Sequence, residues 1–256
     1  MSDPVAVEVE RRVARCTIAD PERRNALGPE LAEILIGTLE RLDADDEVRV
    51  VVLAGTGDFF ATGPDIRSYS GSGRGPASDT AMAGFWERHR ALAKPSVAAV
   101  AGWALSTGCE LALACDLMVV AKDAVFGMPE ITFGLIPSGG ATQRLTRALG
   151  RARAMELILT GRRMTGGQAF DWGLANIVMD RRDVLDQAVM LAEEVAARPP
   201  LALRYAKQAV LAADDLGLTA GLERERELFG AALATEDRVE GIEALLEGRK
   251  PDFRGR

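Results

Sequence analysis

The chain has 256 residues, 48% of them hydrophobic and 27% charged, which is the balance of an ordinary globular protein. A net charge of −7 disfavours a nucleic-acid surface, because phosphate binding needs a basic face. Three cysteines in apolar surroundings, with no paired spacing, indicate free thiols in a reducing compartment and neither disulfides nor a zinc site. The N-terminus, "MSDPVAVEVE", has no basic start and no apolar core, so we expect no signal peptide and a cytoplasmic protein.

The first third of the chain predicts an α/β fold. Residues 5–18 alternate as a strand or hairpin would, and a turn-rich segment follows. A helix is expected from Pro29, because leucines recur at helical spacing. The continuous β-branched run at residues 48–55 reads as a strand covered on both faces. Strand, helix and strand in this order are typical of α/β architecture.

Residues 68–80 are rich in glycine and serine and have little to bury, which predicts a mobile, linker-like loop. Their three glycines do not form a dinucleotide-binding fingerprint, because that motif must join a strand directly to a helix.

The middle of the chain continues the alternation. The longest apolar region, residues 95–121, contains Glu110 and Asp116 and is read as a buried α/β segment and not as a membrane span. From residue 136 to 174 we expect successive short helices with glycine stops, and from Val184 amphipathic helices that form a C-terminal layer near residue 195. The other expected elements are helices at 81–93 and 108–116 and strands at 95–102, 117–122 and 124–131.

The residue content of the chain argues against several kinds of active site. The single histidine, His89, lies among charged residues and is read as a solvated helical residue, with no nucleophile motif near it. No phosphate-binding glycine loop ending in Lys-Ser or Lys-Thr is present.

Two carboxylates are therefore the leading acid-base candidates. Glu110 lies in "TGCELALAC" and Glu130 in "VFGMPEITFGLIP", both without a basic neighbour. An apolar environment disfavours the charged form, so the pKa of such a carboxyl rises toward the operating pH. The alternative is that each glutamate is a buried partner of a distant cation, for which Arg144 and Arg147 are available.

These motifs carry a resemblance. The segment Trp103 to Gly150 resembles the signature region of the enoyl-CoA hydratase/isomerase, or crotonase, superfamily. The segments "PERRNAL", "FATGPDI", "AMELILTGRRMTGGQAFDWGLANIV" and "ATEDRVEGIEALLEGRKPDF" match the same family in order, so the resemblance covers nearly the whole chain.

The resemblance implies a fold and a division of the chain. It implies a spiral of ββα units over residues 1–194, which bind acyl-CoA and carry catalysis, followed by helices at 195–256 that form a trimer or a dimer of trimers. No cofactor or metal is implied, since coenzyme A is part of the substrate. The partners are then an acyl-CoA thioester and further copies of the chain, with no nucleic acid and no membrane.

The resemblance also implies a reaction. Glu110 and Glu130 match the two glutamates of the hydratases, at the family spacing of 20 positions. The hypothesis is that a water held between them adds to C3 of a 2-enoyl-CoA with Glu110 as base, and that Glu130 protonates C2. Because the family also runs isomerisation and other reactions on this scaffold, an isomerase or another acyl-CoA reaction stays an alternative.

The oxyanion hole departs from the family pattern. Two backbone N–H groups normally stabilise the thioester enolate, and their positions match Thr107 and Pro64. Proline has no N–H, so one expected donor is missing. Gly63 or Asp65 in a shifted loop, or the side chain of Thr62 or Thr107, could substitute. A third hypothesis is a catalytically weak oligomer that only binds acyl-CoA.

For coenzyme A, the resemblance implies contacts from the loop that carries Arg24 and from the segment Ala61, Thr62, Gly63, Asp65 and Ile66. Arg24, Arg67 and Lys250 are candidate phosphate partners, and plain surface solvation is the alternative for Arg67. Phe133 and Ile136 could line the acyl pocket, but packing in the core is the expectation for both.

Overall fold

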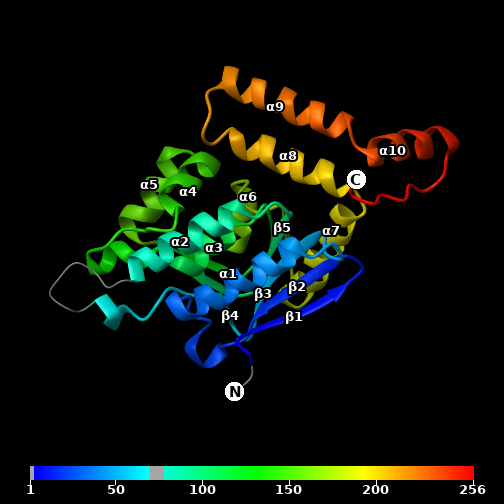
Figure 1. Ribbon diagram of the computed structural model, residues 1–256. Helices are drawn as coiled ribbons and strands as arrows, with labels where there is room; N and C mark the ends of the chain where they lie inside the picture. Colours follow the sequence, from blue (N-terminus) through cyan, green and yellow to red (C-terminus); the bar gives the residue numbers. More distant parts are fainter. Residues whose placement is uncertain (1–2, 70–77) are drawn as a thin grey trace.

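The computed structural model describes residues 3–69 and 78–256 of the chain. Two β-sheets form its centre (Figure 1). The larger sheet has the order β1-β2-β3-β5-β7-β10, and the smaller one has the order β4-β6-β8-β9. The larger sheet consists of β1 (Val5–Glu10), β2 (Val13–Ile18), β3 (Val50–Gly55), β5 (Ser96–Val100), β7 (Leu117–Ala121) and β10 (Ile177–Met179). The smaller sheet consists of β4 (Phe59–Ala61), β6 (Trp103–Leu105), β8 (Val125–Gly127) and β9 (Arg163–Thr165).

The chain passes from one sheet to the other in repeated units. Each of the pairs β3 and β4, β5 and β6, and β7 and β8 places its first strand in the larger sheet and its second in the smaller one. After the first two pairs a helix returns the chain to the larger sheet, and a 3-10 turn is the first element after β4 and after β8. These helices are α2 (Ser78–Ala91) and α3 (Thr107–Ala114). The repetition is the ββα spiral that the resemblance implied.

The predicted N-terminal elements are confirmed. Residues 5–18 form an antiparallel hairpin, and α1 (Pro29–Ala44) begins with proline in its first turn, where the missing N–H leaves no bond unmade. Its face with Leu31, Leu35 and Leu39 is buried. Strand β3 pairs in parallel with β2 and β5 and is buried along nearly its whole length, as its β-branched sequence predicts.

Three expectations for the middle of the chain were wrong in detail. Residues 124–131 are not one strand, because β8 ends at Gly127 and a 3-10 turn, η3 (Pro129–Phe133), follows; Pro129 cannot donate to a strand ladder. The helices after residue 136 are interrupted by β9, which pairs antiparallel with β8. The predicted loop at 68–80 falls largely on residues 70–77, outside the described residues, and α2 already begins at Ser78.

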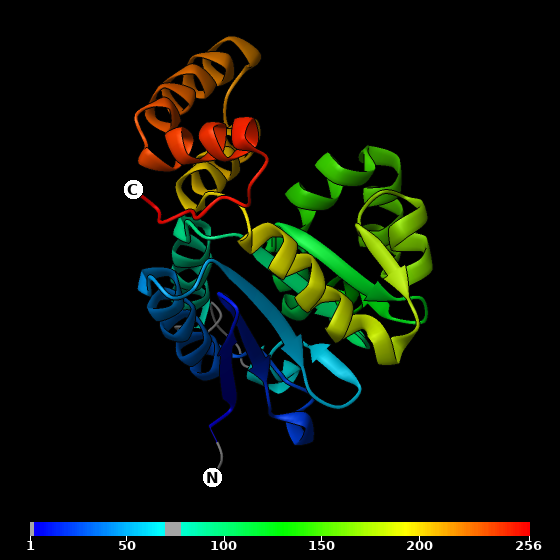
Figure 2. The same cartoon turned by 90° about the vertical axis from the view of Figure 1, so that its right-hand side faces the viewer.

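The later helices form two groups. The helices α4 (Ala141–Leu149) and α5 (Arg151–Thr160) pack on each other, and α7 (Val184–Ala196) lies across β2, β3, β5 and β7 (Figure 2). Three helices then extend away from the sheets toward the top of Figure 1. They are α8 (Pro200–Ala212), α9 (Leu218–Leu233) and α10 (Glu236–Glu247). Short elements complete the list: α6 (Gly166–Asp171), η1 (Pro21–Arg23), η2 (Ile66–Tyr69) and η4 (Arg181–Asp183).

The helical C-terminal layer is confirmed as a structural feature from Val184 onward. The predicted boundary after residue 194 lies in the last turn of α7, a helix that covers the larger sheet. The division into a catalytic region and an oligomerisation region stays a prediction.

Candidate active site

Three parallel strands of the smaller sheet end at one edge and place the candidate residues there. Ala61 of β4 pairs with Ala104 of β6, and Leu105 of β6 pairs with Gly127 of β8. Because the carboxyl ends of parallel strands share an edge, the segments that follow them start side by side. These segments are 62–66, 106–110 and 128–133, and they contain Pro64, Thr107, Glu110 and Glu130.

Glu110 is held rigidly in the interior. Glu110 is 2% exposed and lies in the first turn of α3. The carboxylate atom Oε1 accepts hydrogen bonds from the backbone N–H groups of Gly139, at 2.7 Å, and Ala141, at 3.1 Å. The carboxylate is therefore fixed by the segment that opens α4, 29 and 31 residues further along the chain. Neither nitrogen could be identified from sequence, since a backbone donor leaves no residue signal.

Burial raises the pKa of the Glu110 carboxyl, as the sequence predicted. The two backbone hydrogen bonds act in the opposite direction, because they favour the charged form. Among the charges nearby, Glu130 raises this pKa further and Arg144 lowers it. The pKa is thus moved toward the range in which a carboxylate can accept a proton near neutral pH.

Glu130 is also buried, with 6% of its surface exposed, in the 3-10 turn that follows β8. Its Oε2 atom is buried and has no hydrogen-bond partner among the residues that the structure describes. A buried carboxyl oxygen without a partner is unfavourable unless a water or a ligand satisfies it. This atom is therefore available to a water or to substrate.

The alternative of an ion pair between Glu110 and a distant arginine is not what the structure shows. Arg144 donates through Nη1 to the carbonyl oxygen of Gly139 at 2.8 Å, and Arg147 pairs with Asp214. Within residues 3–69 and 78–256, no ion pair joins Glu110 to either arginine. The carboxylate is thus left with backbone partners only.

Thr107 and the loop after β4 lie against each other. As the first residue of α3, Thr107 has an N–H with no acceptor inside its helix. Its nitrogen lies 3.7 Å from the position that a Cβ on Gly63 would take. A Cβ on Gly108 would overlap the carbonyl oxygen of Ala61 and lie 2.7 Å from the nitrogen of Thr62. Gly63 and Gly108 thus allow the loop after β4 and the start of α3 to approach closely. The Thr107 N–H lies next to Gly63, the residue before Pro64.

Thr62 cannot substitute for the donor that Pro64 lacks. Its N–H donates to the carbonyl oxygen of Asn25 at 3.2 Å, and its hydroxyl donates to that of Arg24 at 3.1 Å. Asn25 itself is fully buried, and its side-chain amide donates to the carbonyl oxygens of Thr56 and Phe59. Asn25 thus holds the turn between β3 and β4 through its side chain and Thr62 through its carbonyl oxygen, and no sequence pattern indicated this role.

The phosphate candidates do not come together in one chain. Arg24 is exposed, with its guanidinium 5.9 Å from the centre of the Phe59 ring, and Arg67 pairs with Asp65 at 2.8 Å. Lys250 follows α10, which lies far from β4 in Figure 1. Arg24 and Arg67 flank the loop after β4, whereas Lys250 lies in another part of the chain.

The expectation that Phe133 and Ile136 pack in the core was wrong. Phe133 is 41% exposed and Ile136 is 68% exposed. Both follow Glu130 on the surface beside η3, as does Ile66 on the neighbouring loop, which is 61% exposed. Exposed apolar side chains next to buried carboxylates can contact a bound acyl chain.

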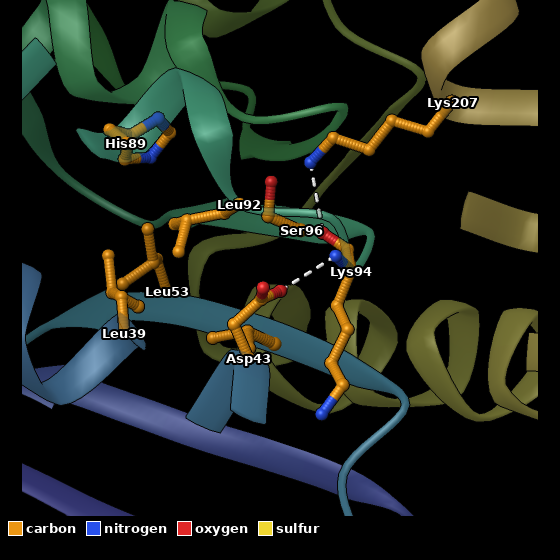
Figure 3. Close-up of a pocket in the computed structure, with 9 residues that line it drawn as sticks. Leu39, Asp43, Leu53, His89, Leu92, Lys94, Ser96 and Lys207 are labelled. Atoms are coloured by element: carbon orange, nitrogen blue, oxygen red, sulfur yellow. Dashed lines mark hydrogen bonds between the residues drawn. The ribbon is translucent and has the colours of Figure 1, made fainter. Parts of the chain in front are cut away.

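The expectation of a solvated His89 was also wrong. His89 is 6% exposed, and its Nε2 atom is buried without a hydrogen-bond partner among the described residues. It lines a small cavity with Leu39, Leu53 and Leu92 and with the polar side chains of Asp43, Lys94, Ser96 and Lys207 (Figure 3). Burial, then the charges of Lys207 and Arg144, lower the pKa of His89 to about 4, against a smaller opposing effect of Asp116. The charged sequence neighbours point away from the core while the histidine itself points inward.

Comparison with known proteins agrees with this geometry. The family model described as enoyl-CoA hydratase/isomerase matches residues 8–256. The chain belongs to the enoyl-CoA hydratase/isomerase family. It is 42% identical over 250 residues, 98% of each chain, to an Escherichia coli protein named 2,3-dehydroadipyl-CoA hydratase. Among solved structures, an enoyl-CoA hydratase from Bacillus anthracis superposes with a TM-score of 0.94 at 32% identity, covering 99% of this chain and 100% of that one. Another from Polaromonas superposes with a TM-score of 0.92 at 35% identity, covering 97% and 99%.

Family membership confirms two predictions. The fold is that of the crotonases, with helices at its C-terminal end, and the chain is an enzyme of the enoyl-CoA hydratase type. Across the described ranges of the chain, no helix is both long and apolar enough to cross a membrane, and no cluster of side chains suits a metal ion. The compartment and the absence of a cofactor stay predictions.

Proposed function

We propose that this protein adds water across the double bond of a 2-enoyl-CoA to give a 3-hydroxyacyl-CoA, with Glu110 and Glu130 as the acid-base pair. One observation carries the proposal. Two buried carboxyls start from neighbouring strand ends, one fixed by two backbone N–H groups and the other with an unpartnered oxygen. Such a pair can hold one water and divide the roles of base and acid.

In the proposed mechanism Glu110 acts as the base and Glu130 as the acid. The water oxygen bonds to C3 while Glu110 takes a proton from the water, and the electrons of the double bond move toward the thioester oxygen as an enolate. Glu130 then gives its proton to C2, and the C–H bond formed there completes the 3-hydroxyacyl thioester. Exchange with solvent returns both carboxyls to their starting states. The raised pKa of Glu110 supports its role as base.

The enolate needs hydrogen-bond donors at its oxygen, and the Thr107 N–H is the first. Its position at the start of a helix adds the favourable end of the helix dipole.

We further propose that the loop after β4, with Ala61 before it, contacts the pantetheine chain, and that Arg24 and Arg67 contact the phosphates of coenzyme A. Phe133 and Ile66 are proposed to touch the acyl chain, and Lys250 to reach the phosphates from a neighbouring copy.

Loss of the conjugated enoyl-thioester absorbance tests the proposal directly. Purified protein is mixed with crotonyl-CoA, longer 2-enoyl-CoAs and 2,3-dehydroadipyl-CoA. Glu110→Gln and Glu130→Gln should each lower kcat about 10²- to 10⁴-fold, because each removes a proton-transfer group. Glu243→Gln, an exposed glutamate in α10, is the matched control and should leave kcat unchanged. Wild-type turnover that survives in both active-site variants would exclude this mechanism.

Pro64 favours a second candidate, an acyl-CoA-binding protein of weak activity, because one expected backbone donor is missing. Tight binding of acyl-CoA with no turnover on the whole panel would support it. A double-bond isomerase is separated from the hydratase by product analysis from a 3-enoyl-CoA.

We propose that no metal or cofactor takes part, because the N–H donors and the carboxyls supply the required charge stabilisation and proton transfer. Activity should then persist after dialysis against EDTA.

We also propose that α8 to α10 form a trimer or a dimer of trimers. This proposal is supported by exposed apolar side chains on these helices, which a monomer would leave in water. They are Val210, Leu218, Phe229, Leu245 and Leu246. Light scattering on the eluting protein measures the number of copies.

A further inference from the structure

Ser106, the residue before α3, has an unusual backbone conformation. Its φ of 54° and ψ of −130° lie in a region that glycine fills readily and other residues avoid. A side chain in such a region is strained and persists only where the surrounding structure holds it. The strain here is set by the hydrogen bonds on both sides, since Ser106 donates to Gly127 at 2.9 Å and its carbonyl oxygen accepts from Glu110 at 3.0 Å.

The Ser106 side chain packs against the loop after β4, in which Pro64 lacks the backbone N–H expected as the second oxyanion donor. A Cβ on Gly63 would overlap its Oγ atom and lie 2.7 Å from its Cβ atom. The same position is 3.7 Å from the Thr107 nitrogen, so the hydroxyl, Gly63 and the Thr107 N–H are immediate neighbours. Gly63 directly precedes Pro64, the residue whose N–H is absent.

Ser106 is half-buried, and within the described residues its hydroxyl makes no hydrogen bond. A serine hydroxyl can donate one hydrogen bond, so this one is available to a ligand. Thr62, the other hydroxyl of the loop, is already engaged with the carbonyl oxygen of Arg24. Ser106 therefore has both the free donor and the location that the site requires.

We propose that the Ser106 hydroxyl donates a hydrogen bond to the thioester oxygen and replaces the backbone donor that Pro64 removes. The oxyanion hole of this enzyme is then one N–H, from Thr107, and one O–H, from Ser106. The inference rests on the proposed function, because it concerns the enolate of the same site. It predicts that Ser106 acts on the enolate more strongly than on the bound ground state.

The test compares Ser106→Ala and Ser106→Gly in the full-length protein. Both remove the hydroxyl, but glycine also relieves the backbone strain, so a purely structural role predicts opposite effects of the two on the melting temperature and little loss of rate. The inference predicts that both lower kcat with crotonyl-CoA on the order of 10²-fold. Affinity for the saturated ligand butyryl-CoA should change by less than about threefold, because the ground state has little charge on its oxygen.

A second variant asks whether the hydroxyl and the missing N–H serve the same atom. Pro64→Ala restores a backbone donor, so the loss caused by Ser106→Ala should shrink to about tenfold or less in that background. A kcat within about twofold of wild type in both Ser106 variants, or an undiminished loss in the Pro64→Ala background, would overturn the inference. So would a Thr107→Val variant that reproduces the loss while Ser106→Ala does not.

Acetoacetyl-CoA gives a readout that does not depend on hydration. Donors at the thioester oxygen favour its enolate, whose absorbance reports the fraction of enolate in the bound ligand. Both Ser106 variants should reduce this absorbance at saturation, and an unchanged absorbance overturns the inference. If the wild-type protein hydrates no enoyl-CoA, the proposed function fails by itself, and the enolate absorbance still decides the role of Ser106.

Discussion

Gly139 both holds Glu110 and leaves room for it. Its N–H donates to Oε1 of Glu110 at 2.7 Å, and a Cβ on Gly139 would lie 2.6 Å from Oε2 of the same carboxylate and would overlap the indole of Trp86. Contacts this short require the carboxylate or the indole to move. A residue of the loop before α4 thus fixes both the direction and the position of the proposed base.

Gly139→Ala should therefore lower kcat on the order of 10²-fold, because a shift of the reacting group by about 1 Å can cost that much. Gly84→Ala is the matched control, since a Cβ there meets nothing within 4 Å and alanine favours the helix α2. Initial rates with crotonyl-CoA and the melting temperature of both variants check this. Equal rates in the two variants would contradict the tight fit around Glu110.

Glu110→Gln should make the protein more stable at pH 7 while it loses activity. The folded-state pKa of Glu110 is raised above its unfolded value, so its contribution to stability falls as the pH rises through that window. Glutamine is neutral and can still accept both backbone hydrogen bonds. The free energy of unfolding in urea at pH 7 should therefore be higher in the variant than in the wild-type protein. A decrease would mean that the charge of Glu110 is stabilising in the folded state.

The raised pKa of Glu110 should also appear in the pH dependence of the wild-type reaction. With a raised pKa, the acid limb of kcat/KM in the wild-type protein lies above the ordinary carboxyl range near 4.5. Rate profiles from pH 4.5 upward measure it. A limb at or below 4.5 would contradict the effect of burial on this group.

Gly108→Ala should damage the oxyanion hole through the backbone. The added methyl group would overlap the carbonyl oxygen of Ala61, so α3 and the loop after β4 would have to separate and the Thr107 N–H would move. We expect a destabilisation of about 1–3 kcal/mol and a loss of rate larger than that of binding. Gly37→Ala, with no atom within 4 Å of its new Cβ, is the control and should keep full activity. Retention of both rate and stability by Gly108→Ala would show that the two segments are not in tight contact.

His89 should make the protein sensitive to mild acid. Its folded pKa of about 4 lies below the ordinary value of 6.5, so the unfolded chain binds the proton first and stability falls as the pH decreases from 6.5 to 4. The full effect is about 3 kcal/mol, at about 1.4 kcal/mol per pKa unit. Because the chain has a single histidine, urea unfolding of wild type and His89→Phe across this window isolates its contribution. Parallel curves for the two proteins would contradict the burial of a neutral imidazole.

The apolar neighbours of Glu110 and Glu130 were enough to predict two buried carboxyls, and the continuous β-branched run at 48–55 was enough to predict a covered strand, which the structure forms at 50–55. Such patterns are local, because burial of one segment imposes its own periodicity on the sequence. His89 shows the limit of this reasoning. Its neighbours in sequence are charged, but a helix turns 100° per residue, so adjacent residues face opposite environments.

The site around Pro64 shows which of its features follow from the sequence and which follow only from the tertiary structure. The sequence alone determined the family of motifs, the two carboxyls and the loss of one backbone donor, since each depends only on the identity of a residue. The partners of Glu110 at Gly139 and Ala141, and the Ser106 hydroxyl beside Gly63, depend on segments that lie 29 to 43 residues apart in the chain. Only the folded chain brings them together, because three parallel strands end at one edge and glycines there let the backbones touch.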